Sequence, residues 1–344
     1  DARAPPRRAS HGMPGSDRLG VPRTVSLWGA PMWLGQPIDG TDKGPALVRG
    51  TEEAPLAKGM QRMGWRVKNR GDIEMPVLKG KDLPPTGPNA MFAHNSASVG
   101  KGCQNIYEAC LSSAQAGHFT MLLGGDHSVA VGTVAAALKA NPDIGVIWVD
   151  AHADLNTPQE SPSGNLHGMP VALLTRLVDP KRIPGFEWLA DTPPLDPKQI
   201  VYVGLRDIDI YERRVIPELG IAAYTMEQID RFGIGSVMQH AVDRLSGRPL
   251  HLSYDIDAVD PEVAPATGTR VKGGLNYREA LYVAESVART LELVSMDLVE
   301  VNPDAHEAKE DEVEDTVDLA QRLCKAGLGQ VILPDPFAHK GLDM

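Results

Sequence analysis

Three side chains that can bind a metal ion stand at two-residue intervals in the stretch WVDAHADLNTP, namely Asp150, His152 and Asp154. They follow an apolar run at residues 145–149. Burying carboxylates and imidazoles costs free energy unless charged or hydrogen-bonding partners compensate them. A lone DxD pair is more often a turn or a helix cap, but the DxHxD pattern behind a buried strand favours a metal site.

Polar residues follow four further apolar runs in the same way. They are Asp126 and His127, Asp207 and Asp209, Asp255, Asp257 and Asp260, and Glu300 and Asn302. In an open parallel sheet, ligands bind beyond the carboxyl ends of the strands. We therefore expect these clusters to meet in one site.

The candidate metal ligands are four carboxylates and two imidazoles: His127, Asp150, His152, Asp154, Asp255 and Asp257. Six ligands are too many for one tetrahedral zinc ion. A carboxylate-rich site with some imidazole and no sulfur suits Mn²⁺, with Mg²⁺, Fe²⁺ or Co²⁺ as alternatives. Two ions ~3.5–4 Å apart would use all six ligands and lower the pKa of a shared water towards neutrality. The residues thus favour two Mn²⁺ ions per subunit and metal-assisted hydrolysis.

The segments that must position these residues alternate between short apolar runs and helix-period stretches. We expect strands at residues 24–30, 118–125, 145–151, 200–205, 250–257, 292–301 and 330–333, and helices at 99–116, 128–140, 234–245 and 277–292. Strands this rich in Val, Ile and Leu are typical of parallel sheets buried on both faces. The pattern predicts an α/β fold in a single domain, with a mainly parallel central sheet and helices on both faces. The acidic segment 304–318 is predicted to begin a solvated C-terminal helix.

The composition excludes several classes of protein. The chain has 344 residues, a net charge of -11 and a pI near 5.4, which argue against a nucleic-acid or anionic-membrane partner. No apolar stretch approaches the ~20 residues of a membrane span. Three cysteines without a CxxC pair indicate neither a disulfide framework nor a thiolate zinc site. We expect an intracellular location, cytoplasmic in the first instance and mitochondrial as the alternative.

The first 23 residues differ from the rest of the chain. They are rich in Arg, Pro and Gly and show little hydrophobic patterning. A flexible tail is the first interpretation, and the remnant of an organelle transit peptide is the alternative. The expected organisation is therefore a tail at residues 1–23 and a catalytic domain at residues 24–344.

Five motifs together closely resemble the ureohydrolase family and, within it, the arginases. They are GGDHS, DAHADLN, SGNLHGMP, SYDIDAVDPEVAPATGT and GGLNYREAL, and the resemblance runs from about Val25 to Leu333. It implies one α/β domain with a binuclear manganese cluster at the strand ends, in a homotrimer or a hexamer. It also implies that His127, Asp150, Asp154 and Asp255 hold one ion, and that His152, Asp150, Asp255 and Asp257 hold the other. Asp150 and Asp255 would then bridge the two ions.

The same resemblance implies hydrolysis of L-arginine to L-ornithine and urea by a hydroxide that bridges the metals. Three catalytic residues are implied: Glu300 binds the guanidinium, Asp154 passes a proton to the departing amine, and His167 shuttles protons. The substrate-binding residues implied are Asn156, Ser163 and Asn165 for the α-carboxylate, Asp209 for the α-ammonium with Asp207 and Glu212 in support, and Thr269 and Glu300 beside the guanidinium.

Some positions depart from the pattern of the family. Arg270 and Lys272 place cations where relatives are more often apolar, and Pro162 stands where a hydroxyl residue is more usual. Met32 and Trp33 lie in a loop that could edge the pocket. No metal ligand is missing.

Two other functions stay open at this point. The first is an agmatinase or another guanidino or amidino hydrolase, and the second is a non-catalytic homologue. Agmatine lacks an α-carboxylate and would not need Ser163 and Asn165. The sequence contains all six candidate metal ligands together with His167 and Glu300, and this disfavours a non-catalytic homologue.

Overall fold

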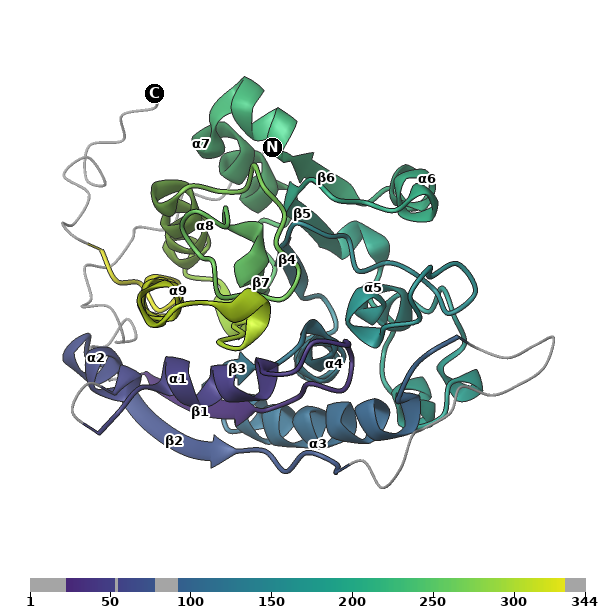
Figure 1. Ribbon diagram of the computed structural model, residues 1–344, viewed down its shortest axis with the longest axis horizontal. Helices are drawn as coiled ribbons and strands as arrows, with labels where there is room; N and C mark the ends of the chain where they lie inside the picture. The colour runs from purple at the N-terminus through teal and green to yellow at the C-terminus, as the bar shows by residue number, and fades with distance from the viewer. Residues whose placement is uncertain (1–22, 53–54, 78–91, 332–344) are drawn as a thin grey trace, which may run out of the picture.

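The computed structural model describes residues 23–52, 55–77 and 92–331, in which one eight-stranded sheet forms the centre of the molecule (Figure 1). Its order is β2-β1-β3-β8-β7-β4-β5-β6, and every pairing in this described sheet is parallel. The strands are β1 Thr24–Ala30, β2 Arg66–Asp72, β3 Phe119–Gly124, β4 Gly145–Val149, β5 Ile200–Leu205, β6 Ala222–Thr225, β7 Leu250–Asp255 and β8 Leu293–Val299. The expected α/β fold with a mainly parallel sheet is confirmed.

The apolar runs form strands because the sheet is covered on both faces. Strands β3, β4, β5 and β7 are buried at every residue, which explains their unbroken hydrophobic sequences. Six of the seven expected strands are present. The prediction of a seventh strand at residues 330–333 is wrong for the two residues that the structure describes, because Gln330 and Val331 follow a helix without forming a strand. Residues 332 and 333 lie outside the described part.

The helices form two layers, one on each face of the sheet (Figure 1). One layer contains α3 Ser96–Gln115, α4 Ala130–Ala140, α5 Pro170–Leu174 and α6 Ile210–Leu219. The other contains α1 Gly44–Arg49, α2 Leu56–Arg62, α7 Met226–Arg244, α8 Tyr277–Arg289 and α9 Glu310–Gly327. Each layer buries its own hydrophobic cluster against the sheet.

The expected helices at 99–116, 128–140 and 277–292 correspond to α3, α4 and α8 within a few residues. Helix α7 begins at Met226, well before the expected start at residue 234. Gly233 explains the difference, because its φ of 78° interrupts the helix and the hydrophobic period restarts after it. The acidic segment places Glu310, Asp311 and Glu312 in the first turn of α9, where negative charge suits the helix dipole.

The order of the strands brings several carboxyl ends together. Strand β8, last in the sequence, lies between β3 and β7, and β4 lies on the other side of β7. The carboxyl ends of these four strands are therefore adjacent at one edge of the sheet, at the point where the chain order reverses. Within the described residues, no helix is both long and apolar enough to span a membrane. Cys103, Cys110 and Cys324 are buried and free.

Candidate metal centre and substrate site

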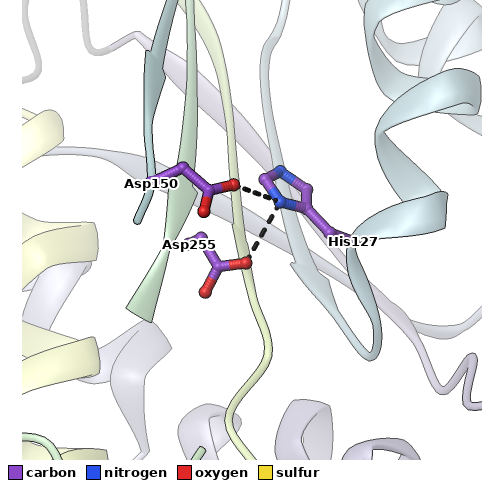
Figure 2. A group of neighbouring side chains, drawn as sticks. All are labelled: His127, Asp150 and Asp255. Carbon is purple, nitrogen blue, oxygen red and sulfur yellow. Dashed lines mark ion pairs between the residues drawn. The ribbon is translucent and has the colours of Figure 1, made fainter. Parts of the chain in front are cut away.

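A buried histidine faces three carboxylates at this edge of the sheet. His127 lies in the turn after β3, and its Nδ1 atom is 3.0 Å from Asp150 Oδ2 and 3.1 Å from Asp255 Oδ2. Figure 2 shows these two carboxylates, from the ends of β4 and β7, on one side of the imidazole. Asp154 Oδ2 lies 3.1 Å from the same nitrogen. All four side chains are buried.

A second group lies beside the first and shares Asp150 with it. His152 Nδ1 is 3.4 Å from Asp150 Oδ1 and 3.1 Å from Asp257 Oδ2. Asp257 is buried, whereas a quarter of the His152 side chain is exposed. The DxHxD spacing therefore places Asp150 between two histidines, and the six ligands expected from the sequence come together in the fold.

The geometry around His127 fits a metal ion better than it fits a hydrogen-bond network. Its Nδ1 atom is buried and makes no hydrogen bond, although the three carboxylates surround it. Separations of about 3 Å are those of neighbouring ligands on an octahedral ion with bonds of ~2.1 Å. A buried polar atom left without a partner is costly, and a cation bound by all four residues would remove that cost.

The acidity of the carboxylates points the same way. Burial, with the neighbouring charge of Asp150, raises the pKa of Asp154 to about 6. Burial and the charges of Asp257 and Asp150 raise the pKa of Asp255 well above its usual value. Asp150 differs, because burial acts to raise its pKa but His127 and His152 lower it. Asp154 and Asp255 thus resist ionisation on their own, and a divalent cation would keep them ionised.

Behind the cluster, a chain of hydrogen bonds fixes the orientation of His127. The hydroxyl of Ser253 on β7 donates to Asp297 Oδ1 on β8 at 2.7 Å, and Ser253 Oγ lies 2.9 Å from His127 Nε2. A hydroxyl has one proton, so Ser253 can only accept from His127. Nε2 then carries the imidazole proton, and Nδ1 is left free to bind a metal.

Asp297 has further partners inside the core. Its Oδ2 atom accepts a hydrogen bond from Thr133 at 2.5 Å and lies 3.0 Å from His251 Nε2. His251 and Ser253 are two residues apart on β7, so their side chains point to the same face of the sheet, where both contact Asp297. The sequence analysis did not assign these residues to the site. A charged residue inside the apolar run SMDLV was the signal that could have identified Asp297.

Trp148 is a second supporting residue that the sequence analysis did not assign. Its indole Nε1 donates to Asp150 Oδ2 at 3.0 Å. The indole also stacks on the ring of His127, with the ring centroids 4.3 Å apart. Trp148 therefore restricts the rotation of both side chains.

Glu300 and His167 form a pair at the edge of the cluster. Glu300 Oε1 accepts a hydrogen bond from the backbone N–H of His127 at 2.9 Å and lies 3.1 Å from His167 Nδ1. Burial alone would lower the pKa of His167, but the hydrogen bond and charge of Glu300 raise it to about 9. This pairing favours the protonated form of His167, which can donate a proton.

The backbone at Gly125 and Asp126 holds this pair in place. A Cβ on Gly125 would lie 1.8 Å from the carbonyl oxygen of Met32, so only glycine fits. Asp126 Oδ2 accepts from the N–H of Gly35 at 2.9 Å, and the carbonyl of Gly35 accepts from the N–H of His167 at 3.0 Å. Asp126 thus anchors the loop that carries the proton donor. Met32 is fully buried, so it does not edge the pocket, whereas Trp33 is partly exposed.

On the side expected to bind the amino-acid end, the N-terminus of α6 meets the loop that follows Asp154. Asn156 Nδ2 donates to Asp209 Oδ2 at 2.7 Å. Glu212 Oε1 accepts from the N–H of Leu155 at 2.8 Å, and its Oε2 accepts from the N–H of Asp209 at 3.0 Å. The structure therefore joins three of the expected substrate residues.

The other expected substrate residues are spread between the metal cluster and the protein surface. Thr269 donates its hydroxyl proton to Asp257 Oδ2 at 2.7 Å, so it lies at the metal cluster. Asp207 Oδ2 is 3.9 Å from His152 Nε2 and is largely exposed. Ser163 is exposed, and its Oγ accepts from the N–H of Asn165 at 3.2 Å, a contact inside their own loop. Proximity thus supports Thr269 directly, whereas Ser163 is exposed and Asn165 is half-buried, and neither contacts the metal cluster in the described structure.

Comparison with known proteins identifies the family. The sequence model of the arginase family matches residues 23–328. The chain belongs to the arginase family. It is 42% identical to the hepatic arginase of Aquarana catesbeiana, over 83% of this chain and 87% of that protein. It is 41% identical to arginase-1 of Homo sapiens, over 93% of this chain and 97% of that protein.

Solved structures agree with this assignment. The arginase of Bacillus caldovelox matches with a TM-score of 0.81 at 35% identity, covering 90% of this chain and all of that one. The fold is therefore that of an arginase-family member. The residues that depart from the expected family pattern lie outside the cluster: Arg270 donates its Nε–H to the carbonyl of Pro265 at 2.5 Å, and Lys272 and Pro162 are exposed.

Proposed function

We propose that this protein hydrolyses L-arginine to L-ornithine and urea. The observation that carries the proposal is the cluster of two ligand groups sharing Asp150, with the Glu300–His167 pair beside it. Membership of the arginase family supports the same reaction.

We infer that the cluster holds two Mn²⁺ ions. His127, Asp150, Asp154 and Asp255 would hold one, and His152 and Asp257, with Asp150 and Asp255 shared, the other. Four carboxylates with two imidazoles and no thiolate suit this hard divalent cation. When bound, such a pair supplies a hydroxide nucleophile near neutral pH by lowering the pKa of water.

Glu300 would bind the guanidinium group. Its Oε1 is occupied by His127 and His167, whereas no hydrogen bond from the described residues reaches Oε2. A carboxylate oxygen with free capacity matches the planar N–H donors of a guanidinium. Thr269, held against Asp257, lies at the same end of the site.

Two groups would handle the protons of the reaction. Glu300 raises the pKa of the His167 imidazole to about 9 and so favours its protonated form. His167 would give a proton to the amine that leaves when the guanidinium C–N bond breaks. Asp154 would take a proton from the nucleophile and pass it towards the same amine.

The rim would recognise the amino-acid end of the substrate. Ser163 and Asn165 present a hydroxyl and an amide to an α-carboxylate, together with Asn156. Asp209 would bind the α-ammonium, with Glu212 holding its backbone and Asp207 adding negative charge.

The wider organisation of the protein is also inferred. The resemblance to the family supports a homotrimer, with a hexamer as the alternative, whose subunits each carry one catalytic domain at residues 24–344 after a tail. The cysteine content fits a cytoplasmic or mitochondrial location.

The test is a comparison of arginine with agmatine. Purified protein is loaded with Mn²⁺ or stripped with a chelator, and urea release is measured for both substrates. We expect activity only with metal, and a kcat/KM for arginine about a hundredfold above that for agmatine, since hydrogen bonds to the carboxylate are lost with agmatine. Equal kcat/KM values would point to another guanidino hydrolase. Two bound ions without urea release would indicate a non-catalytic homologue.

A further inference from the structure

The loop that carries Ser163 and Asn165 is held by a segment far away in the sequence. The N–H of His94, two residues before α3, donates to the carbonyl of Gly164 at 2.8 Å. Gly164 stands between the two residues expected to bind the α-carboxylate. Any contact that fixes Gly164 therefore fixes the backbone that both side chains depend on.

An aromatic side chain packs beside this hydrogen bond. Phe92 packs against His94 with ring centroids 4.8 Å apart, at an interplanar angle of 70°. A Cβ on Gly164 would lie 2.8 Å from Phe92 Cδ1 and 3.1 Å from His94 Cδ2, so both rings lie directly against the loop. Gly164 also has a φ of +73°, which L side chains rarely adopt. The loop can take this shape and fit under the two rings only with glycine at this position.

The other hydrogen bonds described at Ser163 and Gly164 stay within the loop. The N–H of Gly164 donates to Ser161 Oγ at 2.9 Å, a bond within the loop itself. Ser163 is exposed, and the only hydrogen bond that we find for its side chain in the described structure goes to Asn165. Phe92 and His94 thus link the middle of this loop, at Gly164, to the segment that precedes α3.

The proton donor that follows the loop is anchored separately. The N–H of His167 donates to the carbonyl of Gly35, and Gly35 is held by Asp126. Phe92 takes no part in these bonds. Loosening the loop at Gly164 should therefore leave the reacting end of the site in place.

We propose that Phe92 and His94 are positioning residues that fix the rim loop and so select substrates with an α-carboxylate. The inference rests on the proposed function, because it assigns the loop the role of binding the amino-acid end of arginine. The two rings act through Gly164 and touch no reacting group.

The test uses Phe92→Ala, with Phe92→Tyr as the conservative variant. Phe92 is 39% exposed, so its removal should cost little stability. A misplaced binding group commonly costs an order of magnitude or more. We expect Phe92→Ala to raise the KM for arginine about tenfold while kcat and bound metal change less than about twofold. Phe92→Tyr should restore the wild-type KM, because its ring can make the same contact.

Gly164→Ala tests the same contact from the other side. The added methyl group meets both rings at a positive φ, so the KM for arginine should rise at least as much as in Phe92→Ala. Two matched controls are available. Phe232→Ala removes another exposed phenylalanine, on α7, and Gly247→Ala adds a methyl group at a φ of +81° with nothing within 4 Å. Both controls should keep the wild-type KM.

A binding measurement separates this proposal from the proposed function. Calorimetry with L-ornithine and with putrescine, its counterpart without the carboxylate, needs no turnover. In Phe92→Ala we expect the Kd of ornithine to rise about tenfold and that of putrescine to stay constant. An unchanged ornithine Kd, or equal weakening of both ligands, would overturn the positioning role. Failure of the wild-type protein to bind ornithine or release urea would instead contradict the proposed function.

Discussion

At the scale of single residues, the hydroxyl of Ser253 joins Asp297 in the core to His127 in the proposed metal centre. Asp297 accepts the proton of this hydroxyl, so the oxygen of Ser253 can only accept from Nε2 of His127. Burial acts to raise the pKa of Asp297, but the imidazole of His251 beside its carboxylate lowers it. An ionised Asp297 accepts the proton of Ser253 and so favours the imidazole tautomer that leaves Nδ1 of His127 free for a metal.

Replacing Asp297 with asparagine should weaken metal binding. Asparagine has one accepting oxygen where aspartate has two, so either Thr133 or Ser253 loses its acceptor, and the buried network that orients His127 is disturbed. Changes of this kind behind a metal ligand typically cost 10–100-fold in affinity. We expect Asp297→Asn to lose Mn²⁺ to a chelator at about tenfold lower chelator concentration than the wild type.

The control for this variant is Asp196→Asn, which changes a surface cap of a short turn. It should keep the wild-type metal affinity. If Asp297→Asn bound Mn²⁺ as tightly as the wild type and lost only thermal stability, Asp297 would serve the core alone.

The site residues differ in how far the sequence could predict them. The six ligands follow apolar runs, and the parallel sheet brings such positions together, so their convergence could be expected. The backbone of Asp154 and Glu300 could not: both have positive φ values, of 51° and 64°. Such conformations cost of order 1–3 kcal/mol and persist only where tertiary contacts enforce them. No local pattern in the sequence encodes those contacts.

At the scale of elements, the N-terminus of α6 is part of the site. Both carboxylate oxygens of Glu212 accept backbone hydrogen bonds, one from Leu155 beside the proposed metal ligand Asp154 and one from Asp209. This single side chain ties the helix to the loop after β4. The positions of Asn156 and Asp209, which are hydrogen-bonded to each other, depend on it.

Glu212→Gln should therefore raise the KM for arginine. Glutamine has one accepting oxygen, so one of the two N–H groups loses its partner in a buried place, at a cost of about 1–3 kcal/mol in stability. We expect KM to rise about fivefold to tenfold and kcat to change less, measured by steady-state urea release.

Glu279→Gln is the matched control, because Glu279 occupies the same position in the capping box of α8, in the other helix layer. There one oxygen accepts from Asn276, and glutamine can replace it. Equal effects of the two substitutions on KM would show that α6 has no special link to the substrate.

The two strands that the sequence did not predict lack a hydrophobic period. Strand β2 is the polar edge strand RVKNRGD, largely exposed, and β6 has only four half-buried residues. Edge strands are held by backbone pairing with a neighbour rather than by burial, so their sequences carry a weak signal. The contact of His94 with Gly164 could not be predicted from the sequence for a similar reason, since it joins two loops through one backbone hydrogen bond.

At the scale of the whole molecule, the metal site lies where the chain order of the sheet reverses. The proposed metal ligands follow β3, β4 and β7, Glu300 follows β8, and the two helix layers enclose these strands. Four carboxylates from distant parts of the chain thus meet in a buried place, in a protein that already carries a net charge of -11. Folding must oppose their repulsion, and cations that neutralise them bind only the folded state.

Metal should therefore stabilise the whole domain. A ligand at a hundredfold excess over its Kd contributes about 2.7 kcal/mol per site, so two sites contribute about 5 kcal/mol. For a chain of 344 residues this raises Tm by roughly 5–10 °C. Scanning calorimetry with chelator and with Mn²⁺ measures the difference. Asp150→Asn is the informative variant, because Asp150 belongs to both ligand groups and its loss should abolish most of the Mn²⁺-dependent rise. A wild-type Tm that is the same in chelator and in Mn²⁺ would mean that the buried carboxylates are neutralised by protons, and that the site is not built around cations.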